Sequence, residues 1–332
     1  MKRLTIRNIP EDIYAEFEKQ ASINERSVES HARYIVTNAV TSKVKQSGSE
    51  IYQHELTNRL NYLMSLVKNI PTEMNLHPAL LAERLGEKNP LNVMNWFSGH
   101  ATPDFSQIEH LALYTGCNPE WLKFGTNRPF PIKSMQRLNR KGEGYSDALT
   151  LLEPDFKGNP IQKIHIMRIN NEVGNILILR EFENSLNTDF FMTNLHLSEN
   201  IGNAGFHDLC DFFSILQNLY LFYTNNSIFI KSYDLNENSF KFYFEERDCH
   251  PLKILKECAH ESVWWEDIWH QKMLEERNAE ENGYFWPNDK PLIDRIISHL
   301  NSQNRLLDCE TVDLISRYSF GDDSQNVKYK LK

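Results

Sequence analysis

The first residues of the chain constrain its fold more than any other feature. Leu4 and Ile6 alternate with Arg3, Thr5 and Arg7, which is the period of a strand with one apolar and one polar face. No second strand pattern follows nearby, and a lone strand at a chain end is not stable by itself. This segment therefore needs a pairing partner from outside its own neighbourhood.

Two helices are predicted directly after the strand. Ile13, Phe17 and Ala21 recur every four residues after Pro10, and a second helix begins after Ser27, a favourable N-cap. The apolar face of the second helix comprises Val28, Ala32, Ile35, Val36 and Ala39. One strand and two helices in about forty residues cannot bury a core alone. An intertwined dimer, in which each strand pairs with its own copy, would satisfy both needs.

The stretch "RLTIRNIPEDIYAEFEKQASINERSVESHARYIV" resembles a ribbon-helix-helix DNA-binding domain of the Arc/MetJ type, and within that type the FitA-like antitoxins. In that family a two-stranded antiparallel ribbon enters the major groove. The resemblance implies that Arg3, Thr5 and Arg7 read base edges, and that the helix after Ser27 points backbone N–H groups at a phosphate. The alternating pattern alone would also fit a small edge strand with solvated arginines. We expect residues 1–42 to be the dimerisation and DNA-binding domain.

A second all-α domain is predicted after a polar linker at residues 43–53. Residues 54–130 contain five short helix patterns, and "LLAERLG", "NWFSG", "TPDFSQIEHLALYTG" and "NPEWLKFG" resemble a Cro/repressor-type helix-turn-helix domain. The resemblance implies a recognition helix that turns its polar side chains toward DNA. These candidates are Lys88, Asn89, Asn92 and Asn95, and asparagine can read adenine bidentately. With one cation among them, the alternative is a domain that kept this fold for dimerisation or docking.

The charge is unevenly distributed along the chain. The net charge is −9, yet residues 1–45 hold eight Lys or Arg against six Asp or Glu. Residues 54–133 hold seven of each, so the acidic excess lies in the C-terminal part. A locally basic face can bind phosphates on an acidic chain.

A third domain is predicted from residue 149 to residue 332, after a second linker at 131–148 that is basic enough to lie along phosphates. We expect an α+β domain with an antiparallel sheet, which resembles no family that we recognise. Its strand patterns are "IQKIHIMRI", "GNILILREF" and a three-strand meander in "LYLFYTNNSIFIKSYDLNENSFKFYFEE". Helices are predicted around 206–218, 251–275 and 290–303.

Residues of metal-ligand type cluster in this third domain. Cys249, His250, Cys258 and His260 are zinc-ligand types, but their spacing fits none of the familiar zinc sites. Unrelated Cys and His side chains around a helix start are the favoured interpretation. We predict no metal and no cofactor.

A tryptophan-rich segment, "HESVWWEDIWHQ", is the other candidate for chemistry. Trp265 and Trp269 share a helix face, which is typical of a core or an interface anchor. A catalytic pair of carboxylates is an alternative, but no nucleophile or phosphate loop accompanies it. We therefore predict no catalytic residues and no enzymatic activity.

The composition indicates a cytoplasmic protein. Five scattered cysteines in 332 residues are typical of a reduced intracellular chain. The basic start is not followed by an apolar run, so no signal peptide is expected, and no stretch is long enough to span a membrane.

The sequence as a whole predicts a multi-domain α+β protein that regulates transcription, as a repressor. Its expected partners are double-stranded DNA and further copies of itself, as a homodimer or higher oligomer. The C-terminal domain would bind a protein partner or a small ligand. One alternative is an antitoxin-like autoregulator whose C-terminal domain binds a partner protein. The other is a DNA-tethered enzyme with a catalytic C-terminal domain.

Overall fold

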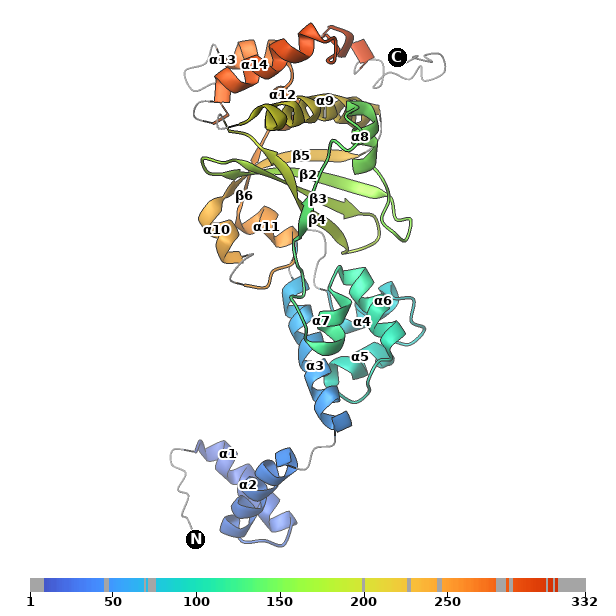
Figure 1. The fold of residues 1–332 in the computed structure, drawn as a ribbon. Helices are drawn as coiled ribbons and strands as arrows, with labels where there is room; N and C mark the ends of the chain where they lie inside the picture. The colour runs from blue at the N-terminus through green and yellow to red at the C-terminus, as the bar shows by residue number, and fades with distance from the viewer. Residues whose placement is uncertain are drawn as a thin grey trace. The chain divides into compact units, whose positions relative to one another are not determined.

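The computed structural model describes residues 9–44, 48–68, 70, 76–198, 201–225, 228–243, 247–278, 285–286, 289–308, 310–312 and 314–315. The chain divides into two compact units, residues 1–57 and 58–332 (Figure 1). A helical N-terminal region and an α/β C-terminal region agree with the multi-domain α+β fold predicted above. None of the described helices combines the length and apolar character needed to cross a bilayer.

The first unit contains a pair of helices, α1 (Glu11–Ile23) and α2 (Val28–Val44). The turn between them uses a left-handed residue, Glu25, with φ of 52°. The Ser27 side chain then accepts a hydrogen bond from the backbone N–H of Ser30 at 3.2 Å, so Ser27 caps α2 as predicted. The buried contact between the two helices is small and centres on Ala21 and His31.

Five helices follow. The first begins at Gly48, inside the predicted linker at residues 43–53, and the other four lie in the region predicted to be all-α. The five helices are α3 (Gly48–Val67), α4 (Pro78–Arg84), α5 (Pro90–Ser98), α6 (Phe105–Thr115) and α7 (Pro119–Phe124). Capping side chains fix their starts: Asn89, Asp104 and Asn118 each accept a backbone N–H of the following helix. Arg59 on α3 donates to the carbonyl oxygens of Leu122 and Lys123, each at 2.9 Å, and so ties α3 to the end of α7.

The C-terminal part of the second unit is built on a six-stranded sheet with the order β1-β4-β3-β2-β5-β6. The strands are β1 (Lys133–Gln136), β2 (Ile161–Asn170), β3 (Asn175–Phe182), β4 (Thr188–His196), β5 (Phe229–Asn236) and β6 (Ala259–Ser262). β1 pairs with β4 and β2 pairs with β5 in parallel, and the other pairs are antiparallel. The sheet is therefore mixed: the antiparallel sheet predicted from the sequence is correct for three strand pairs and wrong for the two parallel ones. A long helix between β4 and β5 crosses over the sheet, which is what a parallel pairing requires.

That helix also corrects the predicted three-strand meander. α9 (Asn203–Asn225) runs through the apolar segment that we expected to be its first strand, and α10 (Glu237–Lys241) occupies the predicted second turn and the start of the third strand. Among the described residues of this stretch, the middle segment alone is extended, as β5. A short continuous apolar run does not distinguish a buried strand from a buried helix by its periodicity, which explains the difference.

The expected linker at residues 131–148 contains regular structure that belongs to the α/β region. It supplies the edge strand β1 and the start of α8 (Gly144–Leu151). Two of its cations contact carboxylates of that region: Lys133 pairs with Asp189, and Arg137 pairs with Asp208 at 3.1 Å. Both cationic side chains are nevertheless more than half exposed, so the phosphate-contacting role expected for this segment stays a prediction.

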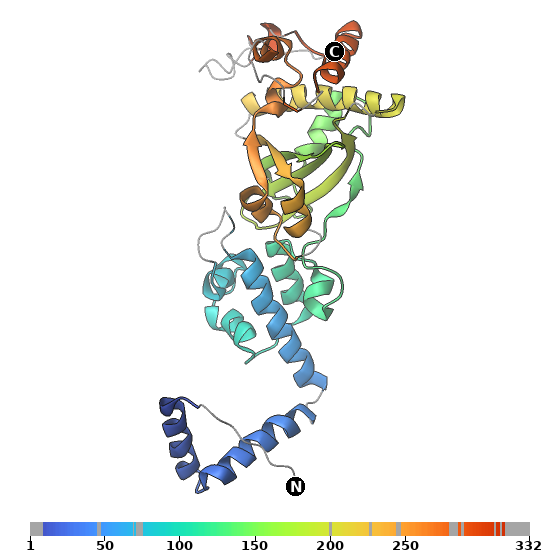
Figure 2. The same cartoon turned by 90° about the vertical axis from the view of Figure 1, so that its left-hand side faces the viewer.

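The helices form layers over the sheet. α9 lies against one face, with α8 beside it, and α14 (Asp289–Ser302) packs on the outer side of α9 (Figures 1 and 2). α12 (Trp264–Asp267) joins this layer, and α13 (Gln271–Asn278) follows it. α10 and α11 (Leu252–Glu257) lie toward the opposite side, near β5 and β6.

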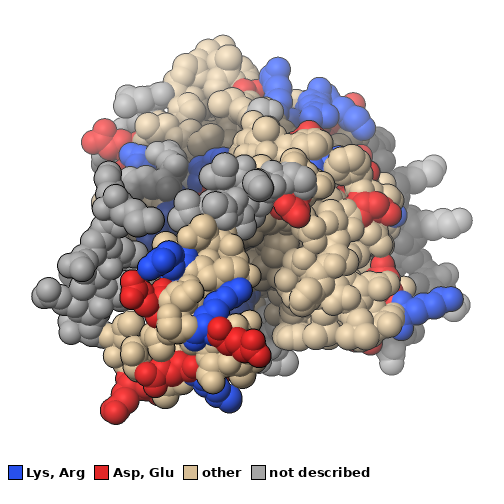
Figure 3. Space-filling view, turned by 90° about the horizontal axis from the view of Figure 1, so that it is seen from below, with Lys and Arg blue, Asp and Glu red and all other residues tan. Residues whose placement is uncertain are grey.

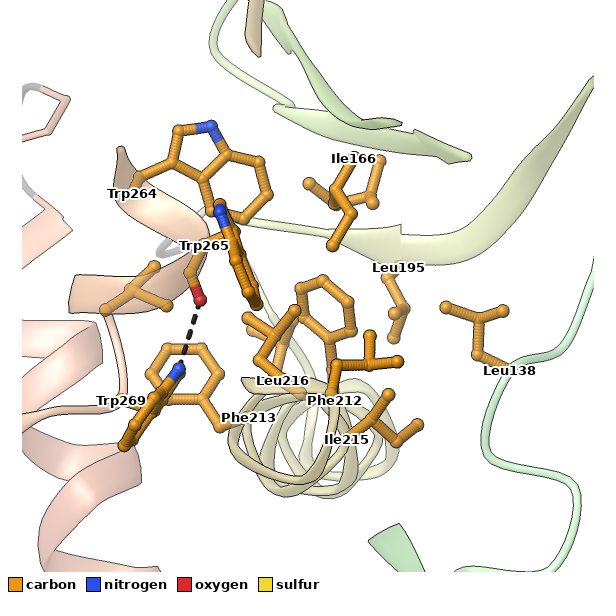
Figure 4. Packing of buried hydrophobic residues seen from close by; sticks show 14 of the residues in the cluster. Leu138, Ile166, Leu195, Phe212, Phe213, Ile215, Leu216, Trp264, Trp265 and Trp269 are labelled. Atoms are coloured by element: carbon orange, nitrogen blue, oxygen red, sulfur yellow. Dashed lines mark hydrogen bonds between the residues drawn. The ribbon is translucent and has the colours of Figure 1, made fainter. Parts of the chain in front are cut away.

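The main core fills the space between α9 and the sheet. Trp264, Trp265 and Trp269 are all buried there, and the Trp269 indole N–H donates to the Trp265 carbonyl oxygen at 3.1 Å (Figure 4). Phe212 and Phe213 of α9 complete the aromatic contact. Of the two roles predicted for the tryptophan segment, core or interface anchor, the structure shows the core.

The close approach of α8 to α9 generates a stability prediction. A Cβ atom on Gly144 would lie 2.8 Å from Ser214 Cβ and 2.9 Å from the Ser214 backbone carbon, whereas a Cβ on Gly202 meets nothing within 4 Å. Gly144→Ala should therefore lower the free energy of unfolding by about 1–3 kcal/mol through overpacking. Gly202→Ala is the matched control and should leave stability nearly unchanged. Denaturant unfolding followed by tryptophan fluorescence measures both, and equal stabilities would contradict the packing described here.

Candidate nucleic-acid interface

The residues predicted to read DNA bases lie at the very start of the chain. Arg3, Thr5 and Arg7 are outside the described residues, so their role stays a prediction. Ser27 is described, is exposed, and lies immediately before α2. Its hydroxyl group accepts the Ser30 N–H, and the other N–H groups of the first turn point outward from the N-terminal end of α2. This geometry suits a phosphate contact through backbone N–H groups.

Near the N-terminal end of α2, some charged side chains would attract a phosphate and others would repel it. Glu29, in the first turn of α2, carries a negative charge that works against a phosphate. It pairs with Arg33 at 3.1 Å, and both side chains are largely exposed. Arg26 directly precedes the cap and places its guanidinium 3.6 Å from the Tyr34 ring centroid. Our sequence reasoning did not select Arg26, although its position next to Ser27 was the available signal.

The two helices of the first unit leave apolar side chains uncovered. Ile13 is 57% exposed and Ile23 is 71% exposed, and Ile35 and Val36 on α2 are also exposed. Isolated apolar residues on a surface are ordinary. Among the side chains of α1 and α2 whose burial is described, however, Ala21 is the one apolar residue that is buried, so this part of the pair has no core of its own. The described part of this unit therefore has the surface expected of one half of a larger assembly.

The candidates on the predicted recognition helix are all placed at or near α5. Lys88 and Asn89 are exposed just before it, and the Asn89 side-chain oxygen accepts the Leu91 backbone N–H at 3.0 Å. This oxygen serves as the helix cap, so a bidentate contact to adenine would require it to accept a second hydrogen bond. Asn92 is exposed, with its amide nitrogen 3.5 Å from Glu87, and Asn95 is half-buried. Asn92 is thus the best placed of the three asparagines.

The exposed side of α5 is only weakly suited to phosphate binding. Leu91 is 56% exposed and Met94 is also exposed between the asparagines, so the surface is partly apolar. On the face drawn in Figure 3, Lys and Arg side chains are scattered among Asp, Glu and uncharged side chains. Since phosphate attraction supplies most non-specific affinity, α5 alone offers little of it.

The C-terminal candidates for metal binding are not brought together. Among the residues that the structure describes, no three His, Cys, Asp or Glu side chains form a group that could hold a metal ion. Burial raises the pKa of Cys249 to about 11 and that of Cys258 to about 12. Burial lowers the pKa of His250 to about 4, and its Nε2 lies 3.2 Å from the Leu186 carbonyl oxygen. These groups are buried parts of the core, and His260 lies exposed on β6.

One buried constellation in the sheet has the residue types of an acid–base site. His165 Nε2 lies 2.5 Å from Glu181 Oε1, and His165 Nδ1 lies 3.1 Å from the Tyr233 hydroxyl. Burial is the main cause that raises the pKa of Tyr233. All three side chains are less than a tenth exposed, so a substrate cannot reach them in this conformation. Their arrangement is that of a satisfied polar network across neighbouring strands.

Comparison with known proteins identifies the N-terminal segment. Residues 3–40 match the family of FitA-like antitoxins with a ribbon-helix-helix domain. This match spans residues 3–10, α1 and most of α2, and it ends before the five-helix region begins. No curated protein and no solved structure matches the chain. The ribbon-helix-helix prediction for the N-terminal segment is thus confirmed at the level of the family, and that family is one of DNA-binding antitoxins and regulators.

Proposed function

We propose that this protein is a sequence-specific DNA-binding transcriptional regulator that acts as a repressor. The observation that carries the proposal is the match of residues 3–40 to a ribbon-helix-helix family. The exposed apolar side chains of α1 and α2 support it, because this family buries such faces in a dimer. Dimerisation through residues 1–42 would supply both the missing strand partner and the missing core.

The proposed mechanism assigns base reading to the ribbon. Two strands, one from each copy, would enter the major groove with Arg3, Thr5 and Arg7 turned toward the bases. Arginine can donate two hydrogen bonds to guanine, and threonine can bond a base edge or contact a thymine methyl group. The N-terminal end of α2, capped by Ser27, would contact a backbone phosphate and so fix the position of the ribbon.

We propose a supporting role for the five-helix region. If α5 is a recognition helix, Asn92 and Asn95 would read bases beside the site of the ribbon. Two modules on one chain raise the effective local concentration of the second once the first is bound. The neutral charge of residues 54–133 implies that this region adds sequence preference rather than general affinity.

The family match also favours one alternative function. The matching family consists of antitoxins, so the chain could regulate its own synthesis through the ribbon while another part binds a partner protein. The α/β region would then provide the surface for that partner. A chain that lacks residues 1–45 should then still bind the purified partner protein. This binding should not weaken when DNA is added, and that result would favour the alternative.

The first test concerns the ribbon. Arg7→Ala should weaken binding to the preferred DNA sequence by about 1–3 kcal/mol and relax specificity at one base pair. The preferred sequence is first selected from a randomised DNA pool, and affinity is then measured at one fixed salt concentration. Lys19→Ala is the control, because it removes the same charge from an exposed position on α1. Equal affinities for the wild-type chain and a folded Arg7→Ala variant would remove the ribbon from base reading.

The second test concerns assembly. Ile13→Glu places a charge on the exposed apolar face of α1, so it should convert a dimer into a monomer at micromolar concentration. Gln20→Glu adds the same charge at an exposed polar position of that helix and should leave the dimer intact. Sedimentation velocity of the full chain measures both. A wild-type monomer, or an Ile13→Glu variant that remains a dimer, would contradict assembly through this unit.

The third test separates the two modules. Asn92→Ala combined with Asn95→Ala should weaken protection at the flanks of the DNA footprint and leave its centre intact. The salt dependence of binding should hardly change, because no cation that contacts phosphate is lost. A footprint of full length in this double variant would assign the five-helix region to protein contacts instead.

A further inference from the structure

A cavity lies where the five-helix region meets the α/β region, within the second unit. Its volume is about 670 Å³, and it is open to solvent. One wall comes from α3, through Tyr62 and Leu66. The others come from Arg128, which follows α7, and from the segment around Arg247 and Lys253. The cavity therefore combines parts of the chain that are far apart in sequence.

The charge of this cavity is opposite to that of the chain. Three cations line it, Arg128, Arg247 and Lys253, and Asp248 is the one described carboxylate that lines it with them. The chain carries a net charge of −9, so a positive cavity is a local departure. Like charges gathered in a concave site raise the local concentration of ions of the opposite sign.

The carboxylate in the cavity is already engaged by neighbouring groups. Arg128 Nε donates to Asp248 Oδ1 at 3.2 Å, and the Tyr62 hydroxyl donates to Asp248 Oδ2 at 3.3 Å. Arg128 also donates to the Arg247 carbonyl oxygen, which fixes the backbone next to the cavity. Asp248 thus compensates the charge of Arg128, and the positive charge of Arg247 and Lys253 remains.

The two remaining cations have different surroundings. The Arg247 guanidinium lies 4.8 Å from the centroid of the Phe242 ring, and its side chain is exposed. The ammonium group of Lys253 is 3.4 Å from the Ser65 carbonyl oxygen in the last turn of α3, a long contact that leaves further donors on the ammonium. Both cations can therefore donate to a ligand in the cavity without breaking a short ion pair.

We propose that this cavity binds a small oxyanion with more than one negative charge, held by Arg247 and Lys253. Charge-assisted hydrogen bonds to such a group are among the stronger polar contacts. Because the walls come from α3 and from the α/β region, the bound anion would stabilise the contact between them. The ligand is a phosphate compound or a polycarboxylate, since both present the same oxyanion chemistry.

The test uses the full chain and two probes, inorganic pyrophosphate and citrate, titrated by calorimetry at constant ionic strength. At least one probe should saturate a single site per chain with a Kd below about 1 mM. Saturation by pyrophosphate alone would identify phosphate chemistry, and saturation by citrate alone would identify carboxylate chemistry. Failure of both probes to saturate would overturn the proposal.

Variants locate the site. Arg247→Ala combined with Lys253→Ala should weaken binding by about tenfold or more, because two charge-assisted contacts are lost. Lys256→Ala, on the exposed side of α11, is the matched control and should bind as the wild type does. Arg247→Lys combined with Lys253→Arg keeps both charges and should retain most of the affinity, which guards against a folding defect in the alanine variant.

A last variant separates this cavity from the proposed DNA ribbon. Arg3→Ala combined with Arg7→Ala should leave anion binding unchanged, because the ribbon is not part of the site. The proposal would be overturned if this ribbon variant lost anion binding while the Arg247 and Lys253 alanine variant bound the anion normally. The measurement contains no DNA, so its failure would leave the proposed DNA-binding function untouched.

Discussion

The helix pair α1 and α2 leaves most of its described apolar side chains uncovered, and the proposed assembly depends on this constraint. Two short helices enclose little more than Ala21 and His31, while Ile13 and Ile35 remain exposed. Hydrophobic burial is the main favourable term in folding, so such a unit gains most of its stability from a partner. A second copy is the partner that the family match supports, and a two-fold axis would also make a symmetric DNA site the natural target.

The second unit, in contrast, has a large buried core of its own. Its core of aromatic and aliphatic side chains is closed between the sheet and α9. The five-helix region is joined to it by specific contacts: the Leu186 backbone N–H donates to the Tyr114 carbonyl oxygen at 2.9 Å, and buried His250 lies against Phe130. A ligand at this junction would therefore act on a contact that already exists. The cavity lies at this junction, so the proposed ligand would contact both regions.

Local signals explain which parts could be predicted from the sequence. The helices of the five-helix region were predictable because capping residues such as Asn89 and Asn118 precede them and Gly99 and Gly125 end them with positive φ. The strand order was not predictable, because it depends on α9, whose C-terminal segment has the composition of a strand. The cavity could not be predicted from the sequence either, because Tyr62, Arg128 and Arg247 are distant in sequence and are brought together by the tertiary fold.

Among the site residues, those whose role depends on local geometry were the more predictable. Ser27 caps α2 as its residue type and position indicated. Asn89 also caps a helix, a role that we did not predict for it from the sequence, and its expected contact with DNA stays a prediction. Sequence spacing places an asparagine on a helix, and only the structure shows which of its atoms are already bonded.

The most direct measurement of the central claim is the stoichiometry of the DNA complex. The full chain is titrated into its selected DNA sequence well above the dissociation constant, and the mass of the complex is determined by sedimentation equilibrium. We expect two chains, or a multiple of two, on each site, with a footprint that is symmetric about its centre. A saturated complex that contains one chain on an asymmetric site would contradict this expectation.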